Sequence, residues 1–327
     1  MKDRLLRRLF MRKIFSFLFF IFIANLAALG QQDPQYTNNM FYKLGVNPGY
    51  AGSEDAISGI ILNRYQWSGF GGGEPKTLVF SADAAIDLFG APGGIGLNII
   101  SDENGFEENV LVNFSYAYKA RLSFGVLGVG VSAGFFSKSI NGEWEVPDDP
   151  FGIYVQPGSD PGIPQGASSQ VAFDSGIGIY LKGLNYFVGA SVTHVNEAAI
   201  KYADLASTYL ARHYYLTGGY NMKLSDPLFE VRPSFLIKSD LAGWQVDLNA
   251  NLVYNDRLWA GMTYRTQDAI ALLMGLELFN GLKVGYSFDL TTSAIARWGY
   301  GSHEIFIGYS VDLERNRSRK YNSVRFL

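Results

Sequence analysis

The chain has 327 residues and no cysteine, which excludes disulfides, thiolate metal sites, a cysteine nucleophile and a lipid-anchored lipoprotein. Only 17% of the residues are charged, while 15% are aromatic and 37 are glycine, a composition more typical of an all-strand protein than of a helical enzyme. Without the N-terminal signal expected below, which carries six basic residues and one acidic residue, 21 Lys+Arg remain against 29 Asp+Glu, a net charge of −8. This balance argues against nucleic acid as a partner.

Residues 1–30 are expected to be a secretory signal peptide that is cleaved on export. Arg12 and Lys13 precede an apolar run at 14–23, and Ala28-Leu29-Gly30 supplies small residues for the cleavage site. Met11 is an alternative start, because it already begins a charged leader. An uncleaved anchor helix is the other interpretation, which the shortness of the apolar run disfavours.

Residues 31–57 form a polar, turn-rich segment before the first expected strand. We interpret it as a periplasmic segment or as one that folds back to plug a lumen. No later run approaches the roughly 18–20 apolar residues of a helical span, so any membrane part must consist of strands.

The strand signal is clearest between Asn109 and Ala120, where the residue type alternates. One face carries Val110, Val112, Phe114, Tyr116 and Tyr118, and the other carries Leu111, Asn113, Ser115, Ala117 and Lys119. Apolar, aromatic-ended faces opposite polar or small ones are typical of a membrane barrel, because lipid tolerates no open sheet edge. The same pattern is expected at about 58–67, 76–86, 93–101, 108–119, 122–137, 171–181, 186–194, 213–223, 228–238, 243–254, 258–265, 269–279, 282–289 and 302–311.

These segments predict an all-β, outer-membrane antiparallel barrel of about 14 strands over residues 58–311. Charges gather on the face assigned to the interior, including Asp83, Asp174, Arg232, Asp247 and Lys283. A soluble sandwich also alternates, but it would carry its charges on the outer face and keep the inner face dry.

The lengths of the connections support the same fold. The even-numbered connections are short, at 87–92, 120–121, 182–185, 224–227, 255–257 and 280–281. Several odd-numbered connections are long, at 68–75, 139–170, 195–212 and 290–301. Short periplasmic turns alternating with long outer loops are typical of outer-membrane barrels, and an even strand number places both termini in the periplasm. Residues 312–327 are then a basic periplasmic tail.

Catalytic and cofactor motifs are weak in this sequence. His194, His213 and His303 lie near expected strand ends and resemble interfacial residues, and no HExxH motif or nucleophile elbow is present. The run at 71–77 has Pro75 where a phosphate loop needs glycine, so we interpret it as an outer loop. The acidic turn at 102–105 lacks calcium-loop spacing and is interpreted as a solvated hairpin. We expect no enzyme activity, cofactor or metal.

The connection at 139–170 is acidic, rich in proline and glycine, and contains Trp144, Phe151 and Tyr154. A loop of this length on a barrel's outer face is expected to be functional. Contact with a partner and constriction of a pore remain equal alternatives.

Several clusters resemble a known family: Gln32-Asp33-Pro34-Gln35-Tyr36, Met40-Phe41-Tyr42, Asn47-Pro48-Gly49-Tyr50-Ala51-Gly52-Ser53, Arg64-Tyr65-Gln66-Trp67 with Gly69, Pro75-Lys76-Thr77, Ser101-Asp102 with Gly105, and Arg325-Phe326-Leu327. With them the chain resembles the PorP/SprF family of outer-membrane proteins of the type IX secretion system in Bacteroidota. The motif residues are Asp33, Pro34, Gln35, Asn47, Pro48, Tyr50, Ala51, Gly52, Arg64, Gln66 and Trp67.

The resemblance implies a barrel that belongs to, or is attached to, the secretion and gliding-motility machinery of the bacterial outer membrane. The implied partners are outer-membrane lipid, large adhesin-like cargo with a C-terminal sorting domain, and periplasmic lipoproteins of the system. As a hypothesis, Trp144, Phe151 and Tyr154 contact cargo, and Arg315, Arg317 and Arg319 contact periplasmic partners. A porin or substrate-specific channel is the alternative function, and an outer-membrane enzyme is disfavoured by the missing nucleophile–base pair.

Overall fold

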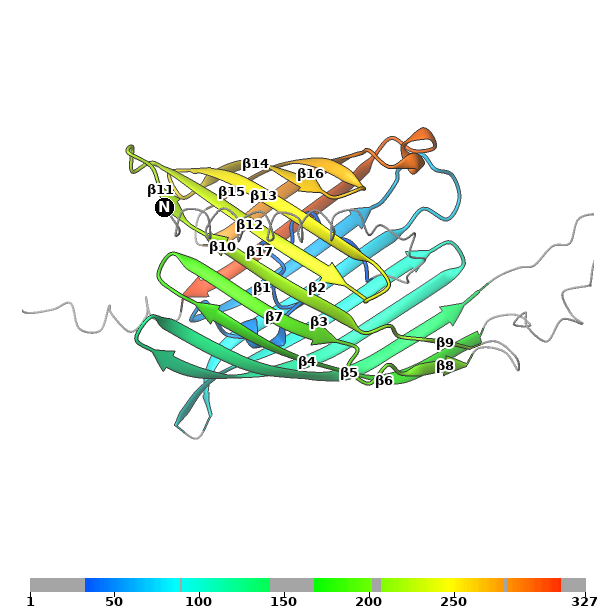
Figure 1. The fold of residues 1–327 in the computed structure, drawn as a ribbon, viewed down its shortest axis with the longest axis horizontal. Coiled ribbons are helices and arrows are strands. Elements are labelled where there is room, and N and C mark those ends of the chain that lie inside the picture. Colours follow the sequence, from blue (N-terminus) through cyan, green and yellow to red (C-terminus); the bar gives the residue numbers. More distant parts are fainter. Residues whose placement is uncertain (1–32, 89, 142–167, 202–206, 279–280, 313–327) are drawn as a thin grey trace, which may run out of the picture.

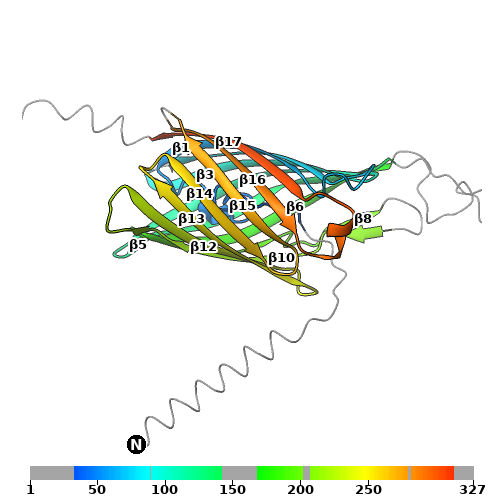
Figure 2. The same ribbon diagram turned by 90° about the horizontal axis from the view of Figure 1, so that it is seen from above.

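The computed structural model describes residues 33–88, 90–141, 168–201, 207–278 and 281–312. Within them, 14 antiparallel strands form a closed barrel (Figures 1 and 2). The barrel strands are β1 (Ala56–Tyr65), β2 (Lys76–Leu88), β3 (Ala91–Asn104), β4 (Glu107–Leu122), β5 (Gly125–Ile140), β6 (Ser168–Lys182), β7 (Tyr186–Thr193), β10 (His213–Tyr220), β12 (Phe229–Ser239), β13 (Trp244–Tyr254), β14 (Leu258–Arg265), β15 (Ala269–Glu277), β16 (Leu282–Thr291) and β17 (Ser302–Asp312).

Each strand pairs with its neighbours in the sequence, and β1 pairs with β17 from Ala56↔Asp312 to Tyr65↔His303, which closes the ring. β10 pairs with both β7 and β12. The short strand β11 (Met222–Lys223) extends the edge of β12, and β8 (Ala199–Lys201) with β9 (Ser207–Tyr209) forms a separate hairpin in the β7–β10 connection. The predicted all-β barrel of about fourteen strands is therefore confirmed.

The outer wall of the barrel is apolar and its inner wall is polar, as the alternation predicts. In β13, Leu248 is 52% and Leu252 is 44% exposed, whereas Asp247 is 3% and Asn249 is 4% exposed. Successive side chains of a strand point to opposite faces, so one set meets lipid and the other meets the lumen. The expected inward charges Asp83, Asp174 and Asp247 are all buried there.

The two ends of the barrel differ in their connections. At the end that we call the turn end, the strands are joined by residues 89–90, 123–124, 183–185, 221–228, 255–257 and 278–281. The opposite end, the loop end, carries the connections at 66–75, 105–106, 141–167, 194–212, 240–243, 266–268 and 292–301, the last with a 3₁₀ turn η4 (Ala294–Arg297). The first and last barrel residues, Ala56 and Asp312, both lie at the turn end. No helix among the described residues is long and apolar enough to cross a membrane.

The described residues before β1 occupy the interior of the barrel. Residues 33–55, which we call the plug, run from the loop end, where Asp33 contacts His194, to the turn end, where Glu54 contacts Lys182 (Figure 1). The plug contains one 3₁₀ turn, η1 (Pro48–Tyr50). The core of the molecule therefore lies between the plug and the inner wall.

The prediction for two histidines was wrong. His194 and His213, expected at the membrane interface, are 3% and 2% exposed in the lumen. β7 ends at Thr193, and His194 follows with a positive φ of 53°, so the alternation of the strand no longer decides where its side chain points. His303 pairs with the hydroxyl of Tyr286, whose ring is exposed on the outer wall.

Candidate functional site: the plug and its anchors

The loop-end half of the plug is bound to a buried ion network. Glu304 on β17 accepts hydrogen bonds from the backbone N–H groups of Thr37, at 2.9 Å, and Asn38, at 2.7 Å. The Thr37 hydroxyl donates to the carboxylate of Asp289 on β16, at 2.7–2.8 Å from its two oxygens. These bonds tie two consecutive plug residues to adjacent strands of the wall.

Two arginines complete this network. Arg64 on β1 pairs with Asp289 at 2.8 Å and with Glu304 at 3.2 Å. Arg265 on β14 pairs with Asp289 at 3.1 Å and with Asp247 at 3.2 Å. Both guanidinium groups also donate to the Thr37 hydroxyl oxygen at 3.1 Å. The carboxylates of this network are buried in the lumen, where an unpaired charge is costly. The two arginines supply their counter-charges.

An aromatic layer follows along the plug toward the turn end. The ring of Phe41 lies 4.8 Å from that of Phe306 and 5.2 Å from that of Trp259, measured between centroids. Tyr42 packs edge-on against Tyr36 at 4.9 Å and donates its hydroxyl to Asn98 at 2.6 Å. Ring pairs at these distances fill the lumen and add specific contacts to area burial.

The middle of the plug lies directly on the backbone of the wall. The Asn47 side chain caps η1 by accepting from the N–H of Gly49 at 2.9 Å, and it donates to the carbonyl of Ile179 at 2.8 Å. A Cβ atom on Gly130 would lie only 2.5 Å from the nitrogen of Gly49, and one on Gly128 or Gly178 would also collide with this turn. Inward-facing glycines thus leave room for the plug backbone.

The next plug residues continue this close approach on β2 and β3. Gly52 has a φ of +67°, a conformation that favours glycine, and its N–H donates to Asp83 at 2.8 Å. A Cβ on Gly94 would collide with the carbonyl of Ala51. Lys119 donates to the carbonyl of Gly49 at 3.0 Å.

The plug leaves the lumen beside two lysines at the turn end. Glu54 pairs with Lys182 at 2.6 Å, and both side chains remain more than one-third exposed. Burial alone raises the pKa of Glu54, but Lys43 and Lys182 outweigh it and hold the pKa below its ordinary value. Burial lowers the pKa of Lys43, whose ammonium lies 4.1 Å from the ring centroid of Phe187.

The plug separates two cavities, one near each end. The loop-end cavity has a volume of about 940 Å³, and its lining includes Asp33, His194 and Lys138. The turn-end cavity has a volume of about 510 Å³, and its lining includes Glu54 and Lys283. Among the described residues, none lines both cavities. The plug and the side chains that hold it therefore lie between the two cavities.

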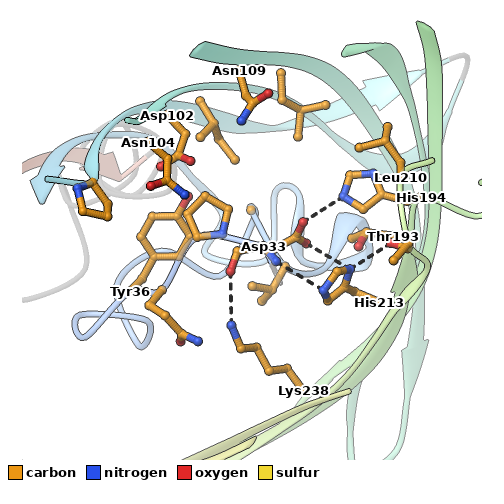
Figure 3. A pocket seen from close by; sticks show the side chains of 18 of the residues that line it. Asp33, Tyr36, Asp102, Asn104, Asn109, Thr193, His194, Leu210, His213 and Lys238 are labelled. Carbon is orange, nitrogen blue, oxygen red and sulfur yellow. Dashed lines mark hydrogen bonds and ion pairs between the residues drawn. The ribbon is translucent and has the colours of Figure 1, made fainter. Parts of the chain in front are cut away.

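Asp33 lies on the wall of the loop-end cavity, between two histidines (Figure 3). Its carboxylate is 3.0 Å from Nε2 of His194 and accepts the hydroxyl of Tyr215 at 2.6 Å, and its carbonyl accepts from Lys238 at 3.2 Å. Burial raises the pKa of Asp33, but the two imidazoles lower it more, so the pKa lies well below its usual range. Asp33, the first residue of the plug at the loop end, is therefore held as an ionised carboxylate.

Most of the family-motif residues lie along the plug or on the wall residues that contact it. Gln35 exchanges amide hydrogen bonds with Gln245, and Tyr50 packs edge-on against Tyr180 at 5.2 Å. Pro34, Gln66 and Trp67 line the loop-end cavity, and Arg64 belongs to the ion network. The motif of the sequence thus consists largely of plug residues and of wall residues that contact the plug.

The structure does not describe the residues expected to bind partners. Trp144, Phe151, Tyr154, Arg315, Arg317 and Arg319 lie outside the described residues, as do the expected signal peptide at 1–30 and all but the first residue of the expected tail at 312–327. The glycine run at 71–73 lies in the β1–β2 connection, where Glu74 accepts from the N–H of Gly69 at 2.8 Å. The backbone of this loop thus binds the carboxylate of Glu74, which belongs to the same loop.

A comparison with protein families decides the identity. The family described as type IX secretion system membrane protein PorP/SprF matches residues 28–309. The chain belongs to this family. The PorP/SprF barrel is accordingly an outer-membrane protein of the type IX secretion system. A search of curated proteins gives no match.

Solved structures similar to this PorP/SprF protein include an outer-membrane protein, a channel and a porin. Omp33 of Acinetobacter baumannii is 6% identical, with a TM-score of 0.44 over 79% of this chain and 98% of that one. A deletion mutant of the monoaromatic hydrocarbon channel TodX is 11% identical, with a TM-score of 0.45 over 79% and 89%. A mutant porin of Rhodopseudomonas blastica is 12% identical, with a TM-score of 0.33 over 78% and 99%.

Sequence reasoning missed the functional importance of the wall residues that hold the plug. Asp289 and Glu304 were expected only as ordinary strand residues, and their contacts with Thr37 span 252 and 267 positions of sequence. A signal existed in the glycines at inward positions of β5 and β6, where a wall that faced only water would need no close backbone approach.

Proposed function

We propose that this PorP/SprF protein is a plugged outer-membrane anchor of the type IX secretion and gliding machinery. In this role it supports the secretion or surface attachment of large adhesin-like cargo, which it recognises through the cargo's C-terminal domain. The observation that carries the proposal is the plug, because a barrel whose lumen is occupied offers surfaces at its two mouths and no open path for solutes.

The loop end is assigned to the cell exterior, because outer loops of such barrels are longer than periplasmic turns. The connections at 139–170 and 195–212 would then meet cargo at the surface. The basic tail, with Arg315, Arg317 and Arg319, would meet periplasmic lipoproteins of the system. Both assignments come from the sequence and the family.

Cargo attachment can be tested in the native bacterium. Deletion of residues 142–166 should remove adhesin-like cargo from the cell surface, as measured by antibody labelling of intact cells, while the barrel still reaches the outer membrane. Deletion of 71–73, another loop-end segment, is the matched control and should leave cargo in place. Normal surface cargo after deletion of 142–166 would refute the cargo role of this loop.

The periplasmic contact needs a separate experiment. Exchange of Arg315, Arg317 and Arg319 for glutamate should reduce the lipoprotein components that co-purify with the barrel. Replacement of the same three residues by lysine keeps the charge and is the control. Unchanged co-purification of the glutamate variant would contradict an electrostatic contact through the tail.

The alternative function, a porin or substrate-specific channel, is separated by conductance. In a planar bilayer the intact chain should show no steady open channel, because the plug lies between the two cavities. Deletion of residues 34–52 should produce one. Steady conductance of the intact chain would favour the channel instead.

A further inference from the structure

One cluster in the lumen has the composition of a metal coordination site. Asp33 from the plug, His194 after β7 and His213 at the start of β10 each offer one ligand atom, and the three atoms lie within 4.8 Å of one another. Figure 3 shows the Asp33 carboxylate directed toward the two imidazoles. No other group of three such residues was found among the residues that the structure describes.

The hydrogen bonds of both histidines fix which nitrogen faces Asp33. Nδ1 of His194 lies 2.7 Å from a carboxylate oxygen of Asp174, and Nδ1 of His213 lies 2.9 Å from the carbonyl of Ala211. Both oxygens accept hydrogen bonds, so both Nδ1 atoms carry a proton. The Nε2 atom of His194 is thereby directed at the Asp33 carboxylate, at 3.0 Å, whereas Nε2 of His213 accepts from the Asp33 N–H at 3.2 Å and its Nδ1 lies 3.8 Å from the Asp33 carboxylate. Because Nε2 of His194 also faces a carboxylate oxygen, it carries a proton that a bound cation would have to displace.

This arrangement is the one that protein metal sites use. A histidine ligand almost always donates its other ring N–H to a carboxylate or a backbone carbonyl, which sets the tautomer and the orientation of the ring. Here one imidazole has each kind of acceptor. This hydrogen-bonding pattern supports a metal site independently of the convergence of the three ligand atoms.

The charges also suit a divalent cation. Asp33 and Asp174 contribute two carboxylates to the cluster, and Lys238 contacts the carbonyl of Asp33 rather than its carboxylate. The Tyr215 hydroxyl occupies one oxygen of Asp33 and leaves the other, Oδ1, facing His194. A cation at this point would replace the hydrogen bond from the Asp33 N–H to Nε2 of His213, which is 3.2 Å long.

We propose that a divalent transition-metal ion of the Zn²⁺ type binds to Asp33, His194 and His213. The ion would hold the loop-end residues of the plug against β7 and β10. Two imidazole nitrogens and one carboxylate suit Zn²⁺ and its neighbours better than Ca²⁺ or Mg²⁺, which prefer oxygen ligands. All three residues line the loop-end cavity, so water can supply a fourth ligand. The inference does not depend on the cargo role.

The first test uses purified full-length mature protein in detergent, stripped with a chelator and titrated with Zn²⁺ in a calorimeter. We expect about one ion per chain, and at least a tenfold loss of affinity in His194→Gln and in His213→Gln. Asp174→Asn, which changes the acceptor behind His194 but none of the three proposed ligands, should weaken binding roughly 10–100-fold. His303→Gln, the remaining histidine, should bind as the unmodified chain does.

A second test needs no variant and therefore does not depend on whether the variants fold. Cu²⁺ bound to the unmodified chain should show two nitrogen ligands in its electron paramagnetic resonance spectrum. Zn²⁺ should also raise the urea midpoint of the unmodified chain but not that of the double variant His194→Gln/His213→Gln. Equal binding by the double variant, or a Cu²⁺ spectrum with fewer than two nitrogens, would overturn the proposal.

Discussion

The two halves of the plug are held by different physical means. Residues 33–39 contact the wall through charges and hydrogen bonds centred on Arg64, Asp289 and Glu304. Residues 47–52 lie with their backbone against inward-facing glycines and make few charged contacts. The first half depends on counter-charges for buried carboxylates, and the second depends on the absence of side-chain atoms. The comparison predicts that different kinds of substitution will release each half.

The largest effect is expected from removal of one arginine of the network. Arg64→Ala leaves Asp289 and Glu304 with one counter-charge fewer in a buried site, and this should lower the free energy of unfolding by about 3–5 kcal/mol. Urea titration of the detergent-solubilised barrel, followed by tryptophan fluorescence, measures the loss. Arg232→Ala is the matched control, since Arg232 is 42% exposed and its pair with Glu230 should contribute no more than about 1 kcal/mol. Equal losses would remove the distinction between the two arginines.

The second half should respond to a single added methyl group. Gly178→Ala places a Cβ against the Asn47 amide and Pro48, so we expect a loss of about 1–3 kcal/mol and a displaced plug. Conductance in a planar bilayer should rise along with the loss of stability. Gly59→Ala is the control, because the nearest atom to its Cβ lies 3.7 Å away. An unchanged Gly178→Ala variant would show that the turn can move without cost.

A smaller loss of stability is expected at Asn47, whose side chain both caps η1 and hydrogen-bonds to the wall. Asn47→Ala removes the cap of η1 and the bond to the carbonyl of Ile179, which should cost about 1–2 kcal/mol in urea. Ser293 stands at the same position before η4 but makes no side-chain capping bond, so Ser293→Ala should leave stability within about 0.5 kcal/mol of the unmodified chain. A comparable loss in both variants would assign the effect to the turn sequence rather than to the contact.

The smallest effect is expected at the turn end. Lys182→Ala breaks a half-exposed pair with Glu54 and should change stability by no more than about 1 kcal/mol. Because the folded pKa of Glu54 lies below its ordinary value of 4.5, the contribution is present above that pH and is lost as the pH falls below it. The difference between the two chains in urea should therefore shrink in acid. A difference that grows in acid would have the wrong sign for this pair.

The wall of the barrel was predictable because its signal is local. In β4 and β13 each residue is sorted between lipid and lumen by its immediate position in the alternation, so Phe114 and Leu248 could be placed without knowledge of any partner. The fourteen strands, their order and the inward charges follow from that sorting and from the connection lengths.

The interior was not predictable in the same way. Asp33 and His194 are 161 positions apart, and the sequence contains no periodic pattern that links them. His194 was placed by extending the alternation of β7 past its end, where a positive φ changes the direction of the chain. The motif residues Asn47 and Arg64 were recognised by resemblance, but the contacts that they make depend on how the segment folds back through the ring.

The passage of residues 33–55 from one mouth to the other constrains how the molecule is assembled. The ring closes where β1 meets β17, and β17 is the last barrel strand of the chain. A segment that fills the hole must already lie inside when this seam forms, or else be threaded through afterwards. Since Ala56 follows the plug directly, the segment that fills the lumen is covalently joined to one of the two strands that form the seam, and insertion of the plug is thereby coupled to closure of the ring.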